Sequence, residues 1–69
     1  MTKGEHRVVV SFNPSGDLWV DEVKVAAAKL IDLIEDIPDL EMDERKRLKA
    51  LAEIESAAMW AVKAATKKP

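Results

Sequence analysis

The sequence has 69 residues, no cysteine, one histidine and a formal net charge of −2. These numbers predict one small domain, and they exclude disulfides, thiolate zinc sites and iron–sulfur clusters. Domains of this size bury a small share of their surface, so we expect homo-oligomerisation to supply further stability. No run of about 18 apolar residues is present, so we expect a cytosolic protein with no membrane partner.

The charged residues are distributed unevenly along the chain. Residues 1–44 hold 4 basic and 11 acidic residues, whereas residues 45–69 hold 7 basic and 2 acidic ones. The acidic overall balance disfavours a general nucleic-acid coat protein. The basic end can nevertheless present cations to a phosphate group while the rest of the chain keeps the protein soluble.

Residues 1–17 predict an extended arm followed by a turn. Residues 1–7 form a polar tail, and the three valines at 8–10 are β-branched and favour extended backbone. This valine run has no second strand to pair with, so no sheet is expected within one protomer. Residues 11–16, SFNPSG, are turn formers that include a proline and a glycine.

Residues 18–36 have the apolar spacing of an amphipathic helix. Asp17 or Asp21 can cap its start, because a carboxylate there accepts hydrogen bonds from unpaired backbone N–H groups. Pro38 predicts an end at about Asp36, since the residue before a proline avoids the α conformation.

Residues 43–66 predict a second helix, joined to the first by a short connection and packed antiparallel to it. This helix is apolar around most of its circumference after Leu48, and one partner helix cannot cover it. Other copies of the chain are expected to do so, and Trp60 is expected to pack against another subunit. The predicted fold is all-α: a single domain over residues 1–69, with an extended arm and turn followed by an antiparallel two-helix hairpin, assembled as a homo-oligomeric helical bundle.

The sequence predicts that the protein is not an enzyme. It contains no glycine-rich phosphate loop, no His-Glu-x-x-His and no Gly-x-Ser-x-Gly. His6 in a polar tail is a poor general base, and neighbouring carboxylates such as Asp21 and Glu22 point in different directions on a helix. We therefore predict no catalytic residue, no metal site and no cofactor.

The turn after the valines has the composition of a ligand-binding segment. Phe12 can stack on a nucleobase, and the polar side chains of Ser11, Asn13 and Ser15 can hydrogen-bond a phosphate or a base edge. Pro14 makes the turn rigid. In the alternative interpretation, Phe12 fills a gap between the helices and the turn binds no ligand.

Lys24 lies near the edge of the apolar stripe of the first helix. Its stem can follow that surface while its ammonium reaches a phosphate, although it can equally be an ordinary boundary lysine. The basic residues at 45–49 either steer an anion or only keep the second helix soluble. Glu55 is an ion-pair partner for Lys63 or for another chain, or else it reaches solvent.

Three sequence motifs together resemble a known family. SFNPSG at 11–16 precedes a helix that contains VDEVK at 20–24, and the second helix ends in ESAAMWAVKAATK at 55–67. This order resembles the small phage anti-CBASS proteins that sequester cyclic dinucleotides, the sponge family. The resemblance covers roughly residues 8–68, and the C-terminal motif is its most specific part.

The resemblance implies a compact helical homo-oligomer, a hexamer in the family, with no enzymatic activity. Family members bind cyclic dinucleotides such as cyclic GMP–AMP between protomers and keep them from bacterial effectors without degrading them. The family stacks an aromatic side chain on the bases and places a lysine at the phosphate, and Phe12 and Lys24 match these positions. It also implies action in the cytoplasm of the infected bacterial host, with no nucleic-acid polymer as partner.

Some members of that family also hold cyclic trinucleotides through an Arg and a Thr on the long helix. Residues 48–52 lack that pair, and Arg47 is the nearby cation that stays a candidate. Two other functions remain open: a helical adaptor that binds nucleic acid through the basic second helix, and a purely structural oligomer. Binding that weakens steeply with salt is typical of the adaptor.

Overall fold

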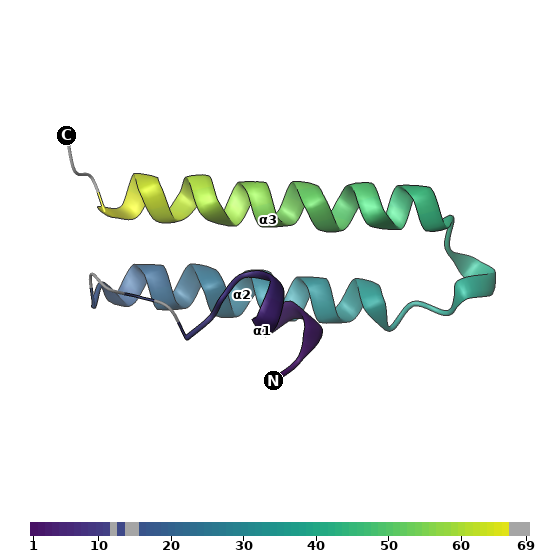
Figure 1. Cartoon of the computed structure of the whole chain (residues 1–69), viewed down its shortest axis with the longest axis horizontal. Helices are drawn as coiled ribbons and strands as arrows, with labels where there is room; N and C mark the ends of the chain where they lie inside the picture. The colour runs from purple at the N-terminus through teal and green to yellow at the C-terminus, as the bar shows by residue number, and fades with distance from the viewer. Residues whose placement is uncertain (12, 14–15, 67–69) are drawn as a thin grey trace.

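The fold is a helical hairpin with a short N-terminal helix packed against one of its arms (Figure 1). Its structure, a computed structural model, describes residues 1–11, 13 and 16–66. These residues form helix α1 (Lys3–Arg7), helix α2 (Leu18–Glu35), the short 3-10 helix η1 (Asp39–Glu41) and helix α3 (Glu44–Thr66). Strands are absent from the described ranges, where the all-α prediction and the hairpin are confirmed.

Helix α2 begins where the sequence offers a cap. The carboxylate of Asp17 accepts a hydrogen bond from the backbone N–H of Trp19 (2.8 Å), which satisfies one of the unpaired donors at the start of the helix. The helix ends at Glu35, close to Pro38, in agreement with the restriction that a proline imposes on the residue before it. Of the two cap candidates in the sequence, Asp17 is the one that caps.

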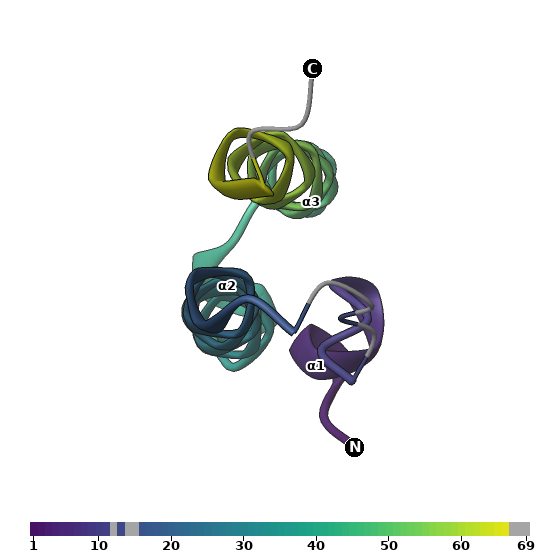
Figure 2. The same ribbon diagram turned by 90° about the vertical axis from the view of Figure 1, so that its left-hand side faces the viewer.

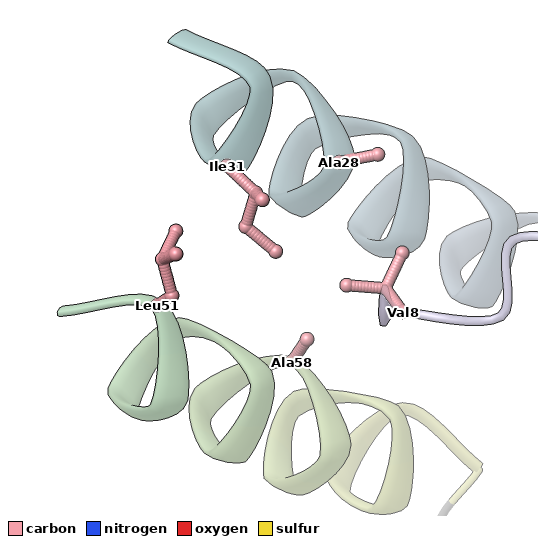
Figure 3. Packing of buried hydrophobic residues seen from close by; sticks show 5 residues of the cluster. All are labelled: Val8, Ala28, Ile31, Leu51 and Ala58. Atoms are coloured by element: carbon pink, nitrogen blue, oxygen red, sulfur yellow. The ribbon is translucent and has the colours of Figure 1, made fainter. Parts of the chain in front are cut away.

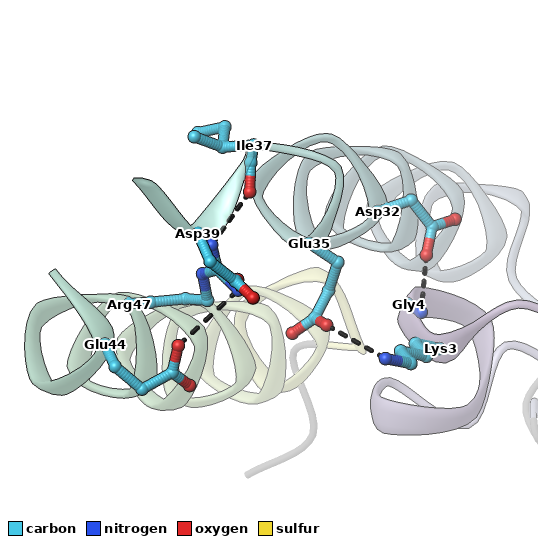
Figure 4. A network of polar contacts seen from close by, with 8 residues as sticks. All are labelled: Lys3, Gly4, Asp32, Glu35, Ile37, Asp39, Glu44 and Arg47. Carbon is cyan, nitrogen blue, oxygen red and sulfur yellow. Dashed lines mark hydrogen bonds and ion pairs between the residues drawn. The ribbon is translucent and has the colours of Figure 1, made fainter. Parts of the chain in front are cut away.

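Residues 37–42 connect the two long helices and contain η1. The side chain of Arg47, which comes from the first turn of α3, lies against this connection and is only 7% exposed. Its guanidinium donates to the carbonyl of Ile37 (2.8 Å) and pairs with Asp39 (3.0 Å) and Glu44 (3.5 Å), as Figure 4 shows. These contacts stabilise the turn that brings α3 back antiparallel to α2.

The core lies where all three helices approach one another. Ile31 of α2 and Leu51 of α3 are almost completely buried, and their side chains point toward each other in Figure 3. Val8, Ala28 and Ala58 complete the cluster of buried side chains. The two alanines have short side chains, which permit close approach of the helices. The described core is therefore small, as the length of the chain suggested.

The prediction of an extended arm is wrong for the first half of residues 1–17. Residues 3–7 form α1 instead of a polar tail, because Thr2 and Glu5 make a capping box at its start. The N–H of Gly4 donates to a carboxylate oxygen of Asp32 (2.7 Å), and Gly4 lies directly against the Ala28 carbonyl, so a Cβ at this position would clash. A glycine is thus required for α1 to dock on α2.

The valine segment is also not extended. Val8 is buried in the core, and the backbone N–H groups of Val9 and Val10 donate to the carbonyls of His6 (3.3 Å) and Glu5 (3.0 Å). This pair of hydrogen bonds is the Schellman arrangement that ends a helix, with Val9 in the left-handed position at a φ of 52°. The burial of Val8 and the helix end outweigh the preference of valine for extended backbone.

The molecule is elongated and thin, with principal dimensions of 44 × 23 × 12 Å. Figure 2, viewed nearly along the long helices, shows α3 on one side of α2 and α1 on another, so that the three form an L. Along the shortest dimension only α1 lies beside α2, and in the described part of the chain no helix lies beside α3 in that direction. Large apolar side chains are consequently exposed, including Leu33 (63%), Trp19 (71%) and Trp60 (61%).

Candidate functional site

A cavity of about 320 Å³ lies in the angle of the L, where α1, α2 and α3 meet. It is lined by the end of α1 and the turn after it, by one residue of α2 and by the second half of α3. The lining residues are Arg7, Val8, Val9, Lys24, Glu55, Ala58, Met59, Val62 and Lys63. Apolar side chains thus form most of the walls, and a few charged groups stand among them.

Lys24 is the residue of α2 in this cavity, and it is buried rather than at an exposed edge. Lys24 is only 8% exposed, and its Nζ donates to the carbonyl oxygen of Val9 (3.1 Å). A buried ammonium needs polar partners, because taking a charge out of water is costly. The left-handed backbone at Val9 belongs to the turn that provides this carbonyl.

Two further cations line the same cavity. Nη1 of Arg7 pairs with a carboxylate oxygen of Glu55 at 3.2 Å, which joins α1 to α3. Lys63 lies at the α3 wall, with its Nζ 4.8 Å from the centre of the Trp60 ring. Three cations and one carboxylate give the lining a formal charge of +2, in a chain whose net charge is −2. The cavity is therefore suited to an anion with apolar parts.

Asn13, a residue of the predicted turn, is bound to the start of α2. Its side-chain amide donates to the carbonyl of Asp17 (2.9 Å) and to the carboxylate of Asp21 (2.9 Å). Gly16 has a φ of 67°, a conformation that glycine adopts without strain. Ser11 is exposed and is not among the residues that line the cavity. Phe12, Pro14 and Ser15 lie outside the described residues, so their predicted roles remain predictions.

The sequence interpretation missed Arg7, both as a residue of the cavity and as a partner of Glu55. Residues 1–7 were expected to form a polar tail, yet Arg7 ends α1 and faces the cavity. The capping-box pattern Thr2-x-x-Glu5 was the signal that could have revealed this helix. Within the described chain, Glu55 pairs with Arg7, at 3.2 Å, rather than with Lys63.

The predicted basic patch at residues 45–49 is divided in the structure. Arg47 is engaged in the connection between the helices, and Lys49 pairs with Glu53 one turn further along α3 (3.2 Å). The same contacts place the guanidinium of Arg47, the candidate for a trinucleotide site, against Ile37 and Asp39. Support for a nucleic-acid adaptor that uses this patch is correspondingly weak.

Metal and membrane sites were also sought in residues 1–11, 13 and 16–66. In that part of the chain, no three His, Cys, Asp or Glu side chains are grouped so that they can hold a metal ion. None of its helices combines the length and the hydropathy of a membrane span.

Comparison with known proteins identifies the family of this chain. The family model described as Acb2/Tad1, hairpin domain, matches residues 3–66, which include α1, α2 and α3. No curated protein and no solved structure matched the chain. The matched range covers nearly the whole sequence, including Lys24 and all but the last residue of the motif at 55–67. The chain therefore belongs to the Acb2/Tad1 hairpin-domain family, the anti-CBASS cyclic-dinucleotide sponges, which is a family of binding proteins rather than enzymes.

Proposed function

We propose that this protein binds cyclic dinucleotide second messengers, such as cyclic GMP–AMP, and sequesters them without degrading them. Acting in the cytoplasm of an infected bacterium, it would thereby block CBASS antiphage signalling. Membership of the sponge family supports this function. The observation that carries it is the buried Lys24, whose ammonium is held in an apolar cavity with a surplus of positive charge.

The chemistry of a cyclic dinucleotide suits this arrangement. The ligand has two phosphodiester anions and two flat bases, so it needs cations next to apolar or aromatic surfaces. Lys24 supplies a charge-assisted hydrogen bond to a phosphate, and Phe12 supplies a ring on which a base stacks. Ser11, Asn13 and Ser15 belong to the same turn and add polar contacts, while Pro14 limits its motion.

The proposed site is shared between protomers of a homo-oligomer, with the hexamer of the family as the expected assembly. The accessible surface of the single chain is 5295 Å², whereas a compact monomer of this mass exposes about 4,300 Å². The excess is close to the roughly 800 Å² that each partner buries in a standard interface. Exposed side chains such as Trp19 and Trp60 are suited to such an interface. In a symmetric pair, each protomer supplies one Lys24 and one Phe12.

Calorimetry with a panel of cyclic dinucleotides tests the proposal. We expect at least one of them to bind, and we expect the intact ligand to be recovered from the heat-denatured protein. Recovery of a linear or hydrolysed product would contradict sequestration. Duplex DNA serves as the comparison ligand, and tight binding of the duplex that weakens steeply with salt would favour the adaptor instead.

Substitutions at the two principal residues test their roles. Phe12→Ala should remove stacking that contributes about 1–3 kcal/mol per base, so two copies in one site can weaken binding a hundredfold or more. Lys24→Met keeps an unbranched apolar stem and removes the ammonium, which should weaken binding about 10- to 100-fold. Lys29→Met, at an exposed lysine of the same helix, is the matched control and should bind as wild type.

Lys24 also donates to Val9, so the folding of each variant must be measured alongside binding. Circular dichroism should show wild-type helical content for Phe12→Ala and Lys24→Met at the temperature of the titration. Wild-type affinity in both variants would contradict the proposed site. If Phe12→Ala loses binding only together with its oligomeric state, Phe12 is a packing residue.

Light scattering tests the assembly. The wild-type mass should be several times 7.7 kDa. Trp60→Ser should lower it, because an exposed ring that packs against another subunit is removed. Leu40→Ser is the control, since Leu40 is fully exposed but lies on η1, in the connection between the long helices, rather than on α3. A wild-type monomer at micromolar concentration would contradict a site shared between protomers.

A further inference from the structure

We infer that Arg7 is a second phosphate-binding residue of the cavity, beside Lys24, and that Glu55 orients its guanidinium while weakening the affinity of the site for anions. This inference rests on the proposed function, because it concerns the same cavity and the same ligand class. It adds an anion-binding residue on α1, a segment that was expected to be a polar tail.

The position of Arg7 is well determined by the fold. It is the last residue of α1, which is capped by Thr2 and docked on α2 through Gly4 and Asp32. Figure 4 shows this docking, with the Gly4 N–H directed at the Asp32 carboxylate. Arg7 then reaches across to Glu55 on α3 and lines the same cavity as Lys24. All three helices therefore contribute charged residues to the same cavity: α1 and α2 contribute one each, and α3 contributes Glu55 and Lys63.

The guanidinium of Arg7 has chemistry that suits a phosphate, beyond what a purely structural ion pair with Glu55 requires. A guanidinium carries five N–H donors in a rigid fork that matches the oxygens of a phosphate, and the contact with Glu55 engages Nη1. The Arg7 side chain is 32% exposed, so a ligand can reach it, yet it is oriented by its partner. An oriented donor loses less entropy on binding.

Glu55 has two opposing effects in this arrangement. Its carboxylate holds Arg7 at the cavity, but among the described residues that line the cavity it is also the one anion. Glu55→Gln keeps a hydrogen-bond acceptor for Arg7 and removes the negative charge, so an anionic ligand should bind more tightly. Removing a negative charge from the cavity favours an anion whether or not Arg7 contacts it, so Glu55→Gln tests the effect of Glu55 on the site. Substitution of Arg7 itself tests whether its guanidinium contacts the ligand.

The test is a calorimetric titration of the full chain with cyclic GMP–AMP and the other cyclic dinucleotides of the panel. Arg7→Met should weaken binding about 10- to 100-fold, and Arg7→Lys should retain part of the affinity because it keeps the charge. Lys3→Met is the matched control, since Lys3 is also on α1 and pairs with a carboxylate, Glu35, at 3.2 Å without lining this cavity. It should bind as wild type.

Glu55→Gln should tighten binding about two- to tenfold at low salt, and the gain should shrink at high ionic strength because it is electrostatic. Glu53→Gln, at the neighbouring ion pair with Lys49, should change nothing. Wild-type affinity in Arg7→Met, or no gain in Glu55→Gln, would overturn the inference while leaving the proposed function intact. A wild-type protein that binds no member of the panel would overturn both. If Arg7→Met lowers the helical content measured by circular dichroism, the affinities of Arg7→Lys and Glu55→Gln test the inference in its place.

Discussion

Among the residues that the structure describes, two cations are buried, Lys24 and Arg47, and their surroundings differ. They are 8% and 7% exposed, so burial alone does not distinguish them. Arg47 lies in the connection of the hairpin, where its guanidinium contacts the Ile37 carbonyl and the carboxylates of Asp39 and Glu44. Its role there is to stabilise a turn of the same chain.

Lys24 lies at the other end of the hairpin, among the walls of a cavity that also holds Arg7 and Lys63. A carbonyl oxygen from the strained turn at Val9 accepts its hydrogen bond. Both cations donate to a carbonyl of a turn, but only Lys24 also lines the cavity that holds the other cations, an arrangement suited to an anion. The surroundings of the two buried charges, rather than their burial, therefore distinguish them.

Gly4→Ala is expected to have the largest effect among the substitutions that distinguish the cavity from the hairpin connection. The added Cβ would clash with the Ala28 carbonyl and crowd the Asp32 carboxylate, so α1 should detach from α2. The loss of stability should be about 2–4 kcal/mol, from overpacking together with a lost charge-assisted hydrogen bond. Urea denaturation measures this loss, and ligand binding should fall because α1 carries Arg7.

Gly16→Ala provides the control for Gly4→Ala. Gly16 has a positive φ but has no atom within 4 Å of an added Cβ, so this change introduces backbone strain of about 1 kcal/mol without a clash. Equal destabilisation by the two substitutions would show that Gly4 is not required for close packing.

A smaller effect, confined to the hairpin connection, is expected from Arg47→Met. The substitution leaves the Ile37 carbonyl without its donor, while Asp39 and Glu44 are 89% and 64% exposed and can be solvated. We therefore expect a loss of about 2 kcal/mol, toward the lower end of what breaking a buried pair costs. The thermal midpoint should fall by several degrees, with ligand affinity in calorimetry within about twofold of wild type.

The comparison between Lys24 and Arg47 would fail if Arg47→Met weakened cyclic-dinucleotide binding as strongly as Lys24→Met. Such a result would indicate that Arg47 belongs to a binding site and that its contacts with the connection are of secondary importance. Arg45→Met, at an exposed arginine two positions earlier, controls for the loss of a positive charge on α3.

The smallest effect is expected from Val9→Asn, and it should be a gain. A β-branched residue is unfavourable in the left-handed conformation, and asparagine tolerates it. Val9 is 51% exposed, so little burial is lost, and stability should rise by about 0.5–1 kcal/mol. Thermal unfolding measures the gain. Val8→Asn, at the buried neighbour, should destabilise the protein, and a gain at both positions would contradict the assigned turn.

The two long helices could be predicted from the sequence because their signals are local. The apolar spacing of residues 18–36, the cap at Asp17 and the restriction imposed by Pro38 each act within one or two helical turns. Three local motifs, at residues 11–16, 20–24 and 55–67, likewise indicated the family, and the match over residues 3–66 confirms that family. Lys24 could be selected as a candidate by the same local reasoning, since it borders an apolar stripe.

The first helix and the cavity depend on contacts between distant residues, and local propensity pointed elsewhere. Three valines favour extended backbone, but Val8 gains more by entering the core against Ala28, Ile31 and Leu51. That packing brings Arg7 to Glu55, 48 positions away in the chain, and places a carbonyl of the turn over Lys24. The sequence by itself determined the hairpin and the candidate lysine. Only the tertiary structure decided which charges share a cavity, because burial and ion pairing are properties of helices packed together.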